Sequence, residues 1–344
     1  MKRQVKVGKI YIGGGAPVSV QSMTNTPTLD YAKTLEQIQR LESAGCDIVR
    51  LAISSDEEVQ SCRQIIGKTK APLVADIQFN YRHAIACADI GFDKIRFNPG
   101  YLDSEDKVKE VVTACKRNGV PIRVGVNSGS LDKEVTAKYD GAEALAQSAL
   151  KHIAILEKFG FYDNVISVKS SDVRTMVKAY EILDEKCDYP LHLGVTESGS
   201  KLRGAVKSSV GIGALLLKGI GDTIRVSLTG DPVSEVETAK MILGSLDLYR
   251  EGVEIVSCPT CSRCEYDMEN IVDTLENSLK GVKKRVKVAV MGCVVNGPGE
   301  AKGADIALCG GGKGKTALYV KGQVVKTIDQ SDAVKEILLL IDKL

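Results

Sequence analysis

The sequence predicts an α/β protein in which a (β/α)8 barrel of the TIM type is followed by a small α+β domain. Short β-branched runs alternate with amphipathic helical runs from residue 18 to about residue 250. The chain has 344 residues, enough for one large barrel with an appendage. It has no Trp and only five Phe, so its core must be aliphatic, which suits buried parallel strands.

Eight strand-like runs make up the predicted barrel. They are Val18–Gln21, Ile48–Leu51, Leu73–Ile77, Lys94–Asn98, Ile122–Val126, Val165–Lys169, Leu191–Thr196 and Thr223–Leu228. Helical patterns lie between them, among them Thr34–Ala44, Lys107–Arg117, Ala142–Lys158 and Glu235–Leu246. Eight βα units indicate a closed barrel. A doubly wound open sheet is the alternative, because strand count alone does not show closure. Gln4–Gly14 is expected to form a lid over the N-terminal end of the barrel.

The regular alternation stops near residue 250, so we divide the chain into domains of residues 1–250 and 251–344. A Cys-rich turn opens the second domain. A helix (Met268–Gly281), a strand (Val286–Met291), a Gly-rich loop, a hairpin-like region and a C-terminal helix (Ser331–Leu344) follow. This irregular order predicts a separate α+β fold.

Composition and charge exclude several classes of protein. The net charge of +2 does not indicate a nucleic-acid binder. The basic N-terminus lacks the apolar segment of a secretory signal, and apolar stretches such as Ile337–Ile341 are too short to span a membrane. The chain has ten cysteines and no export signal, so we expect them to be free thiols or metal ligands and not disulfides. We therefore expect a cytoplasmic protein.

Charged and polar side chains mark the C-terminal ends of the predicted barrel strands, where active sites of such barrels lie. Those ends carry Arg50, Arg96, Asn98, Arg123, Asn127, Lys169, Glu197, Arg225 and Ser227. Positions 96 and 98, 123 and 127, and 225 and 227 share parity, so each pair faces one side of the sheet.

Five buried cations require matching anions. A polyanionic ligand, most simply a diphosphate, would supply them, because Arg makes bidentate phosphate contacts and Lys adds a point charge. For any single residue the alternative is an exposed strand end paired with a loop acid such as Asp47, Asp76 or Asp93. For the five together we favour an anion site at the barrel mouth.

The cysteines of the second domain are spaced like metal ligands. Cys258-Pro-Thr-Cys261-Ser-Arg-Cys264 is a double C-x-x-C step, and Cys293 begins a loop that ends at Glu300. Two ligands from a tight turn and others from a second loop suit a four-ligand soft-metal site. Structural zinc is the commoner explanation of such spacing.

The loop Gly297-Pro-Gly-Glu300 favours a redox-active iron–sulfur cluster over zinc. Its sharp turn delivers a carboxylate where a fourth thiolate would be expected. An oxygen ligand on a soft iron is weak and displaceable, and a structural zinc site would gain nothing from it. Cys264 is the alternative fourth ligand, or a free thiol beside the site. The expected ligands are Cys258, Cys261, Cys293 and Glu300.

The other cysteines and the histidines are weaker candidates. Gly310–Thr316 resembles a phosphate loop, but Cys309 stands where that motif needs Gly, so a hairpin turn is predicted there. His192 is expected to line the barrel, and no histidine has a nearby nucleophile. The remaining cysteines are interpreted as small buried hydrophobic residues, not as ligands; they are Cys46, Cys62, Cys87, Cys115 and Cys187.

Several motifs resemble those of the bacterial 4-hydroxy-3-methylbut-2-enyl diphosphate synthases, over essentially the whole chain. In the barrel they are Val20-Gln-Ser-Met-Thr-Asn-Thr26, Arg96-Phe-Asn-Pro-Gly100, Ile122-Arg-Val-Gly-Val-Asn127, Val168-Lys-Ser-Ser-Asp172, Leu191-His-Leu-Gly-Val-Thr-Glu197 and Gly221-Asp-Thr-Ile-Arg-Val-Ser227. In the second domain they are Cys258-Pro-Thr-Cys261 and Gly292-Cys-Val-Val-Asn-Gly-Pro-Gly-Glu300.

The resemblance implies a specific reaction. The family converts 2-C-methyl-D-erythritol 2,4-cyclodiphosphate to (E)-4-hydroxy-3-methylbut-2-enyl diphosphate in non-mevalonate isoprenoid biosynthesis. It uses a [4Fe–4S] cluster and two electrons from flavodoxin or ferredoxin. The family's cluster ligands fall on Cys258, Cys261, Cys293 and Glu300. Its substrate-binding positions fall on Arg50, Asp76, Arg96, Asn98, Arg123, Asn127, Lys169, Arg225 and Ser227, with Glu197 as a further active-site position.

The resemblance also implies a head-to-tail homodimer, with the cluster of one subunit over the barrel of the other. Glu197 is our candidate proton donor and Glu300 the ligand at which the cluster opens to substrate. Ser262 and Cys264 depart from the family pattern, which more often has Gly and a residue other than Cys. Two rival functions are a zinc-ribbon module fused to a sugar-phosphate barrel, and a pure electron carrier that would not need the basic ring.

Overall fold

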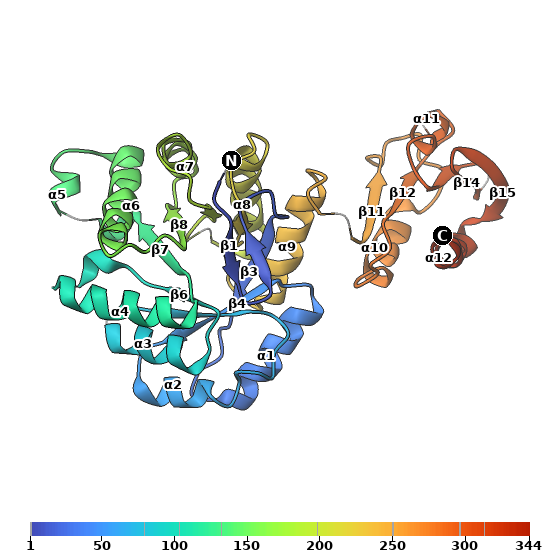
Figure 1. Cartoon of the computed structure of the whole chain (residues 1–344). Helices are drawn as coiled ribbons and strands as arrows, with labels where there is room; N and C mark the ends of the chain where they lie inside the picture. The colour runs from blue at the N-terminus through green and yellow to red at the C-terminus, as the bar shows by residue number, and fades with distance from the viewer. Residues whose placement is uncertain are drawn as a thin grey trace. The chain divides into compact units, whose positions relative to one another are not determined.

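The computed structural model describes residues 2–344 except residues 79, 103, 132, 198, 250, 296 and 313 and the side chain of residue 130. The chain divides into two compact units, Met1–Leu248 and Tyr249–Leu344. The boundary expected at residue 250 falls on a residue outside the described ones. Each unit is described here by itself (Figure 1).

Eight parallel strands form the sheet of the first unit in the order β8-β7-β6-β5-β4-β3-β10-β9. A parallel bridge between Ile166 and Leu191 joins β8 to the residue before β9, so the ring is nearly closed. The strands follow chain order around the ring, whereas a doubly wound sheet reverses its order at a switch point. The predicted barrel is therefore confirmed, and the open-sheet alternative is wrong. The strands are β3 (Ser19–Met23), β4 (Ile48–Ile53), β5 (Leu73–Ile77), β6 (Lys94–Arg96), β7 (Ile122–Asn127), β8 (Asn164–Lys169), β9 (His192–Leu193) and β10 (Thr223–Ile224).

Helices connect these strands, and some of them begin or end at clear capping residues. Asp30 caps α1 by accepting a hydrogen bond from Lys33 N at 3.2 Å, and α4 ends at Gly119 in the left-handed region (φ 62°). The helices lie outside the strands (Figure 1). They are α1 (Tyr31–Ser43), α2 (Asp56–Cys62), α3 (Tyr81–Ile90), α4 (Glu105–Asn118), α5 (Lys133–Thr136), α6 (Gly141–Lys158), α7 (Val173–Lys186), α8 (Lys201–Leu216) and α9 (Val233–Gly244). No described helix is both long and apolar enough to cross a membrane.

A two-stranded hairpin covers the N-terminal end of the barrel, as predicted. Its strands are β1 (Val5–Val7) and β2 (Ile10–Ile12), paired antiparallel. Their buried side chains pack against Ile48, Val74 and Val165, which are the first or second residues of their strands. The hairpin and the strand residues that it contacts therefore form an apolar cluster at the N-terminal end of the barrel.

The second unit contains a five-stranded mixed sheet in the order β11-β12-β13-β14-β15. Its strands are β11 (Val253–Ser257), β12 (Val286–Met291), β13 (Ile306–Gly310), β14 (Lys315–Val320) and β15 (Gln323–Asp329), and its helices are α10 (Met268–Ser278), α11 (Gly297–Ala301) and α12 (Ala333–Lys343). The predicted hairpin joins β13 and β14. The sequence did not predict β11 and β15. These are the sheet's edge strands, and β15 is almost wholly exposed, so neither shows a clear apolar alternation.

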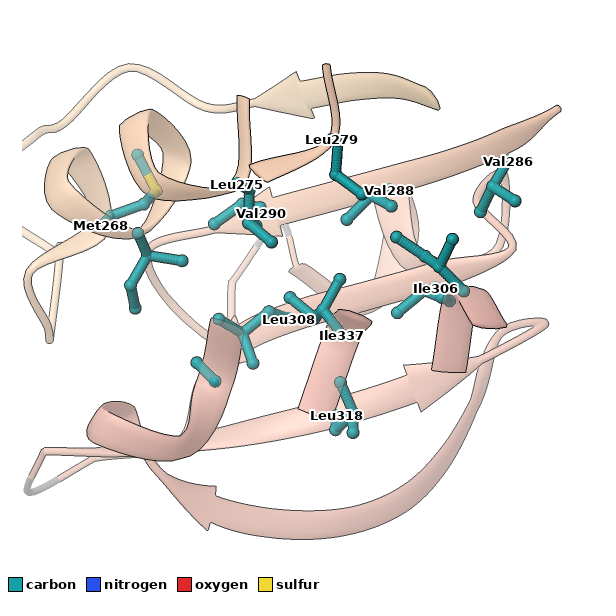
Figure 2. Packing of buried hydrophobic residues seen from close by; sticks show 13 residues of the cluster. Met268, Leu275, Leu279, Val286, Val288, Val290, Ile306, Leu308, Leu318 and Ile337 are labelled. Carbon is teal, nitrogen blue, oxygen red and sulfur yellow. The ribbon is translucent and has the colours of Figure 1, made fainter. Parts of the chain in front are cut away.

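The two faces of this sheet bury different side chains. Figure 2 shows Val288, Val290, Ile306 and Leu308 meeting Leu275 and Ile337 of the two longer helices. On the other face the small side chains of Ala289, Ala307 and Cys309 pack with Ala301 of α11. Strands β11, β12 and β13 are parallel, so their C-terminal ends share one edge of the sheet. Cys258 and Cys293 follow β11 and β12 at that edge.

Candidate active site

Asp76 stands between two of the predicted basic residues in the barrel. Its carboxylate accepts a hydrogen bond from Arg50 Nη2, and its Oδ1 lies 3.5 Å from Arg96 Nη1. Burial raises the pKa of this carboxyl, but the charges of Arg50 and Arg96 outweigh it and hold the pKa below its usual range. Burial lowers the pKa of Arg50 to about 10. The buried carboxylate is therefore ionised and shared between two arginines.

Arg96 and Asn98 also bind the backbone of the next strand. Arg96 Nη2 donates to Gly125 O at 2.9 Å, and Asn98 Nδ2 donates to the same oxygen at 2.7 Å. Asn98 Oδ1 in turn accepts from Gly125 N at 2.8 Å. A Cβ at position 125 would lie 3.0 Å from Arg96 Nε, so the lack of a side chain at Gly125 leaves room for the guanidinium.

Arg123 is buried with part of its guanidinium unsatisfied. Only 1% of its surface is exposed, and its Nε and Nη1 have no hydrogen-bond partner among the described residues. Burial lowers its pKa well below the ordinary value, and the like charges of Arg50 and Arg96 lower it further. A guanidinium is always a donor and never an acceptor, so these N–H groups need acceptor oxygens, which an anion would provide together with compensating charge.

Arg225 is paired with Glu235, a residue that the sequence analysis missed. Arg225 Nη2 lies 3.3 Å from Glu235 Oε1, and the carboxylate also accepts from Ser22 Oγ at 2.8 Å and Leu228 N at 3.1 Å. Glu235 is 4% exposed although it lies in the first turn of α9. An acid in the first turn of a helix is typical of a solvated residue, so the sequence carried no signal for this contact.

The remaining predicted barrel residues lie at the same ends of the strands. Lys169 ends β8 and is in register with Asn127, which ends β7. Burial, then Arg225 and Arg123, lowers the pKa of Lys169 well below its ordinary value. Ser227 is half-buried just beyond β10. Glu197 is exposed beyond β9 in the left-handed region (φ 51°), a strained conformation for a residue other than Gly.

The balance of charge in this basic ring is strongly positive. Among the described residues, its cations form ion pairs with two carboxylates, Asp76 and Glu235. The cations are Arg50, Arg96, Arg123, Lys169 and Arg225. Such a surplus at a buried site attracts a polyanion.

Three of the predicted cluster ligands line one pocket of the second unit. This pocket of about 120 Å³ is lined by Cys258, Pro259, Cys261, Arg263, Met291, Gly292, Cys293 and Gly297. Gly292 N donates to Cys258 Sγ at 3.3 Å, which ties the two loops together. Cys264 N donates to Cys261 O at 2.9 Å and closes a turn. The two cysteine-bearing loops therefore meet as predicted.

Cys264 and Glu300 stand differently from those three residues. Cys264 Sγ donates to Tyr266 O at 3.2 Å, and Glu300 is exposed on α11; neither lines the pocket. Among the residues that the structure describes, no three His, Cys, Asp or Glu side chains are grouped closely enough to hold a metal ion. The assignment of Glu300 as a ligand stays a prediction.

The other cysteines and His192 are mostly internal. His192 is fully buried in β9, and neither ring nitrogen forms a hydrogen bond with a described residue. Cys187 is half-buried. The structure buries the other four of these cysteines, as the sequence predicted; they are Cys46, Cys62, Cys87 and Cys115.

Both units match models of a single family. Residues 2–240 match the GcpE TIM-barrel domain, and residues 254–343 match the GcpE protein C-terminal domain. A Clostridium perfringens protein named 4-hydroxy-3-methylbut-2-en-1-yl diphosphate synthase (flavodoxin) is 52% identical, over 99% of this chain and 98% of its own. Proteins of the same name from Ruminiclostridium cellulolyticum (51%, covering 99% and 97%) and Thermotoga petrophila (52%, covering 96% and 94%) are similarly related.

Solved structures that resemble the chain are much more distant in sequence. Dihydropteroate synthase from Stenotrophomonas maltophilia superposes with a TM-score of 0.53 at 15% identity, over 71% of this chain and 98% of its own. The Yersinia pestis enzyme superposes with a TM-score of 0.52 at 14% identity, over 72% and 100%. At such identities the likeness shows the barrel fold alone.

Proposed function

The chain belongs to the GcpE family, and from this premise we propose that it reductively opens 2-C-methyl-D-erythritol 2,4-cyclodiphosphate to (E)-4-hydroxy-3-methylbut-2-enyl diphosphate. The reaction breaks one carbon–oxygen bond to phosphate and removes one hydroxyl as water. It consumes two electrons and two protons. The chain is thus an oxidoreductase of isoprenoid biosynthesis.

The observation that carries the substrate assignment is the unsatisfied Arg123 within a surplus of buried cations. A diphosphate offers the acceptors that Arg123 lacks and the negative charge that Asp76 and Glu235 do not supply. Guanidinium groups bind phosphate oxygens in pairs, and the buried site strengthens each contact. We assign diphosphate binding to Arg50, Asp76, Arg96, Asn98, Arg123, Asn127, Lys169, Arg225 and Ser227, with Asp76 holding two of the arginines in place.

These residues also act as the ring opens. Opening releases a charged phosphate oxygen, and a preformed ring of cations stabilises that charge without reorganising. Glu197 would hold a proton at its carboxyl oxygen and give it to the departing hydroxyl, which leaves as water. Its left-handed backbone in the loop beyond β9 supports this assignment, because strained residues cluster at active sites.

We assign the electron-transferring group, a [4Fe–4S] cluster, to Cys258, Cys261, Cys293 and Glu300. The shared pocket of the three cysteines supports this, and thiolates are the usual ligands of such clusters. The cluster supplies low-potential electrons, which no protein side chain provides. The relatives' names specify flavodoxin, so we propose flavodoxin as donor, with ferredoxin as the alternative. An oxygen-sensitive cluster and thiol-rich chain suit the reducing cytoplasm.

Anaerobic purification tests this function directly. We expect a coloured protein with a broad absorption band near ~400 nm from thiolate-bound iron, and product formation when reduced flavodoxin is supplied. A colourless protein with one zinc per chain and no turnover would show the zinc-module rival to be correct.

We also propose that the working unit is a homodimer in which each cluster serves the barrel of the partner. Exposed Val294 and Val295, next to Cys293, are apolar side chains that such an interface would cover. Mixing the inactive variants Arg123→Gln and Cys258→Ser tests it. Recovery of activity in the mixture is expected, because one mixed site has both parts intact. A mixture as inactive as its components would contradict the arrangement.

A further inference from the structure

Lys94 is a buried cation that the proposed mechanism does not use. It is the first residue of β6 and is 0% exposed, and no described residue forms a hydrogen bond with its Nζ. It shares parity with Arg96, whose side chain reaches Asp76 inside the barrel. Alternate residues of a strand face the same side, so Lys94 projects into the barrel one layer below Arg96.

Several ionisable groups lie near Lys94, and most of them are basic. Arg50 lies in its row of the sheet, because Arg50 pairs with Val74 and Val74 with Lys94. The other ionisable groups that face it are Asp76 of β5, Asp93 and Arg96 on its own segment, Arg123 of β7 and His192 of β9.

Neither nearby carboxylate neutralises the amine. Asp76 is held by Arg50 and Arg96, and Asp93 accepts a hydrogen bond from Leu73 N at 2.8 Å. Burial lowers the pKa of Lys94 well below its ordinary value, and the charges of Arg123 and Arg50 lower it further. A buried ammonium without an acceptor is unfavourable, so burial favours the neutral amine while the ring holds no anion.

We propose that Lys94 is an additional anion-binding residue of the barrel, which takes up a proton when a diphosphate enters the basic ring. The incoming charge supplies the partner that the ammonium lacks, so protonation and binding favour each other. Affinity for the anion should therefore fall as pH rises. This inference rests on the proposed function, since it needs the diphosphate to bind above Lys94.

Calorimetric titration of inorganic pyrophosphate into the anaerobic, cluster-loaded protein tests the proposal. Measurements in buffers of different ionisation enthalpy give the number of protons taken up on binding. Pyrophosphate itself contributes the same change in ionisation with every variant. A difference in proton uptake between variants therefore comes from the protein. The variants are Lys94→Met, which keeps the length of the side chain, Lys94→Gln as a second uncharged variant, His192→Gln, and Lys109→Met on the exposed face of α4 as control.

We expect both Lys94 variants to take up about one proton fewer than the wild type and to bind about tenfold more weakly, as loss of one nearby charge predicts. Lys109→Met should match the wild type. Unchanged proton uptake in the Lys94 variants would overturn the proposal, and so would loss of the proton only in His192→Gln. If Arg123→Gln also binds pyrophosphate normally, the diphosphate site itself is wrong, which is a failure of the proposed function.

Discussion

Arg96 and Arg123 are direct neighbours across β6 and β7, yet among the described residues Arg96 forms an ion pair with a carboxylate and Arg123 does not. Asp76 is on the opposite side of Arg96, in register with it on β5, and is shared with Arg50. The same register that gives Arg96 its ion pair places Arg123 one strand farther from Asp76. We therefore expect the proposed diphosphate to contact Arg123 on the β7 side of the barrel.

Replacement of Asp76 by Asn should destabilise the barrel in a pH-dependent way. The folded-state pKa of Asp76 is lowered, so the ionised carboxylate contributes stability above its unfolded value near ~3.9, and that contribution is lost as pH falls through the folded value. Removing one partner of a buried pair costs about 3–5 kcal/mol. Urea unfolding at several pH values measures it. A cost for Asp76→Asn that stays constant down to strong acid would contradict the assignment.

Loss of Arg225 should harm the fold mainly by leaving Glu235 unpaired. Arg225→Gln is expected to lower the free energy of unfolding by about 3–5 kcal/mol, and Arg225→Gln with Glu235→Gln by clearly less, because the second change removes the buried charge. Lys158→Gln breaks the exposed pair with Glu105 and serves as control with little effect. Equal losses in the single and double variants would show that the pair does not act as a unit.

Gly292 should be required for packing between the two cysteine loops. A Cβ there would lie 2.8 Å from Cys264 Sγ, so Gly292→Ala must displace one loop. We expect Gly292→Ala to bind less iron and Gly292→Ala with Cys264→Ala to recover it. Iron content and the absorption band measure both. No recovery in the double variant would place the cause elsewhere, for example in the Gly292 N–H that donates to Cys258.

The ligand assignment predicts different roles for neighbouring cysteines. Cys261→Ser should lose the cluster, whereas Cys264→Ser should keep it, because Cys261 lines the pocket and Cys264 does not. Glu300→Ala should lose turnover. Anaerobic reconstitution followed by iron analysis and assay measures all three. If Cys264→Ser loses the cluster while Glu300→Ala stays fully active, Cys264 is the fourth ligand.

The sequence predicted the repeating strands and helices of the barrel and the charged residues at the ends of its strands. Alternating strands and helices indicated the barrel, and the basic strand ends indicated where Arg50, Arg96 and Arg123 gather. Strand β9 is shorter than the predicted Leu191–Thr196, and β10 shorter than Thr223–Leu228. Local β propensity does not show where a ladder stops, because that depends on the neighbouring strand.

Glu235 and Lys94 escaped prediction because their burial is a tertiary property. Glu235 is one of many acids near helix starts, and only its contact with Arg225 distinguishes it. Lys94 begins a strand, where a solvated lysine is ordinary, and only closure of the barrel buries it. The burial of both residues therefore depends on residues that are far away in the sequence.

Turnover of the cyclodiphosphate by Arg123→Gln tests the central claim most directly. Anaerobic wild type and variant are compared with the same reduced flavodoxin, and the absorption band of each shows whether the cluster is present. We expect the variant to keep its band and to lose turnover by at least about a hundredfold, as loss of a buried charge contact of about 3 kcal/mol implies. A variant with an intact band and wild-type turnover would contradict the account, because the basic ring would then play no part in the reaction.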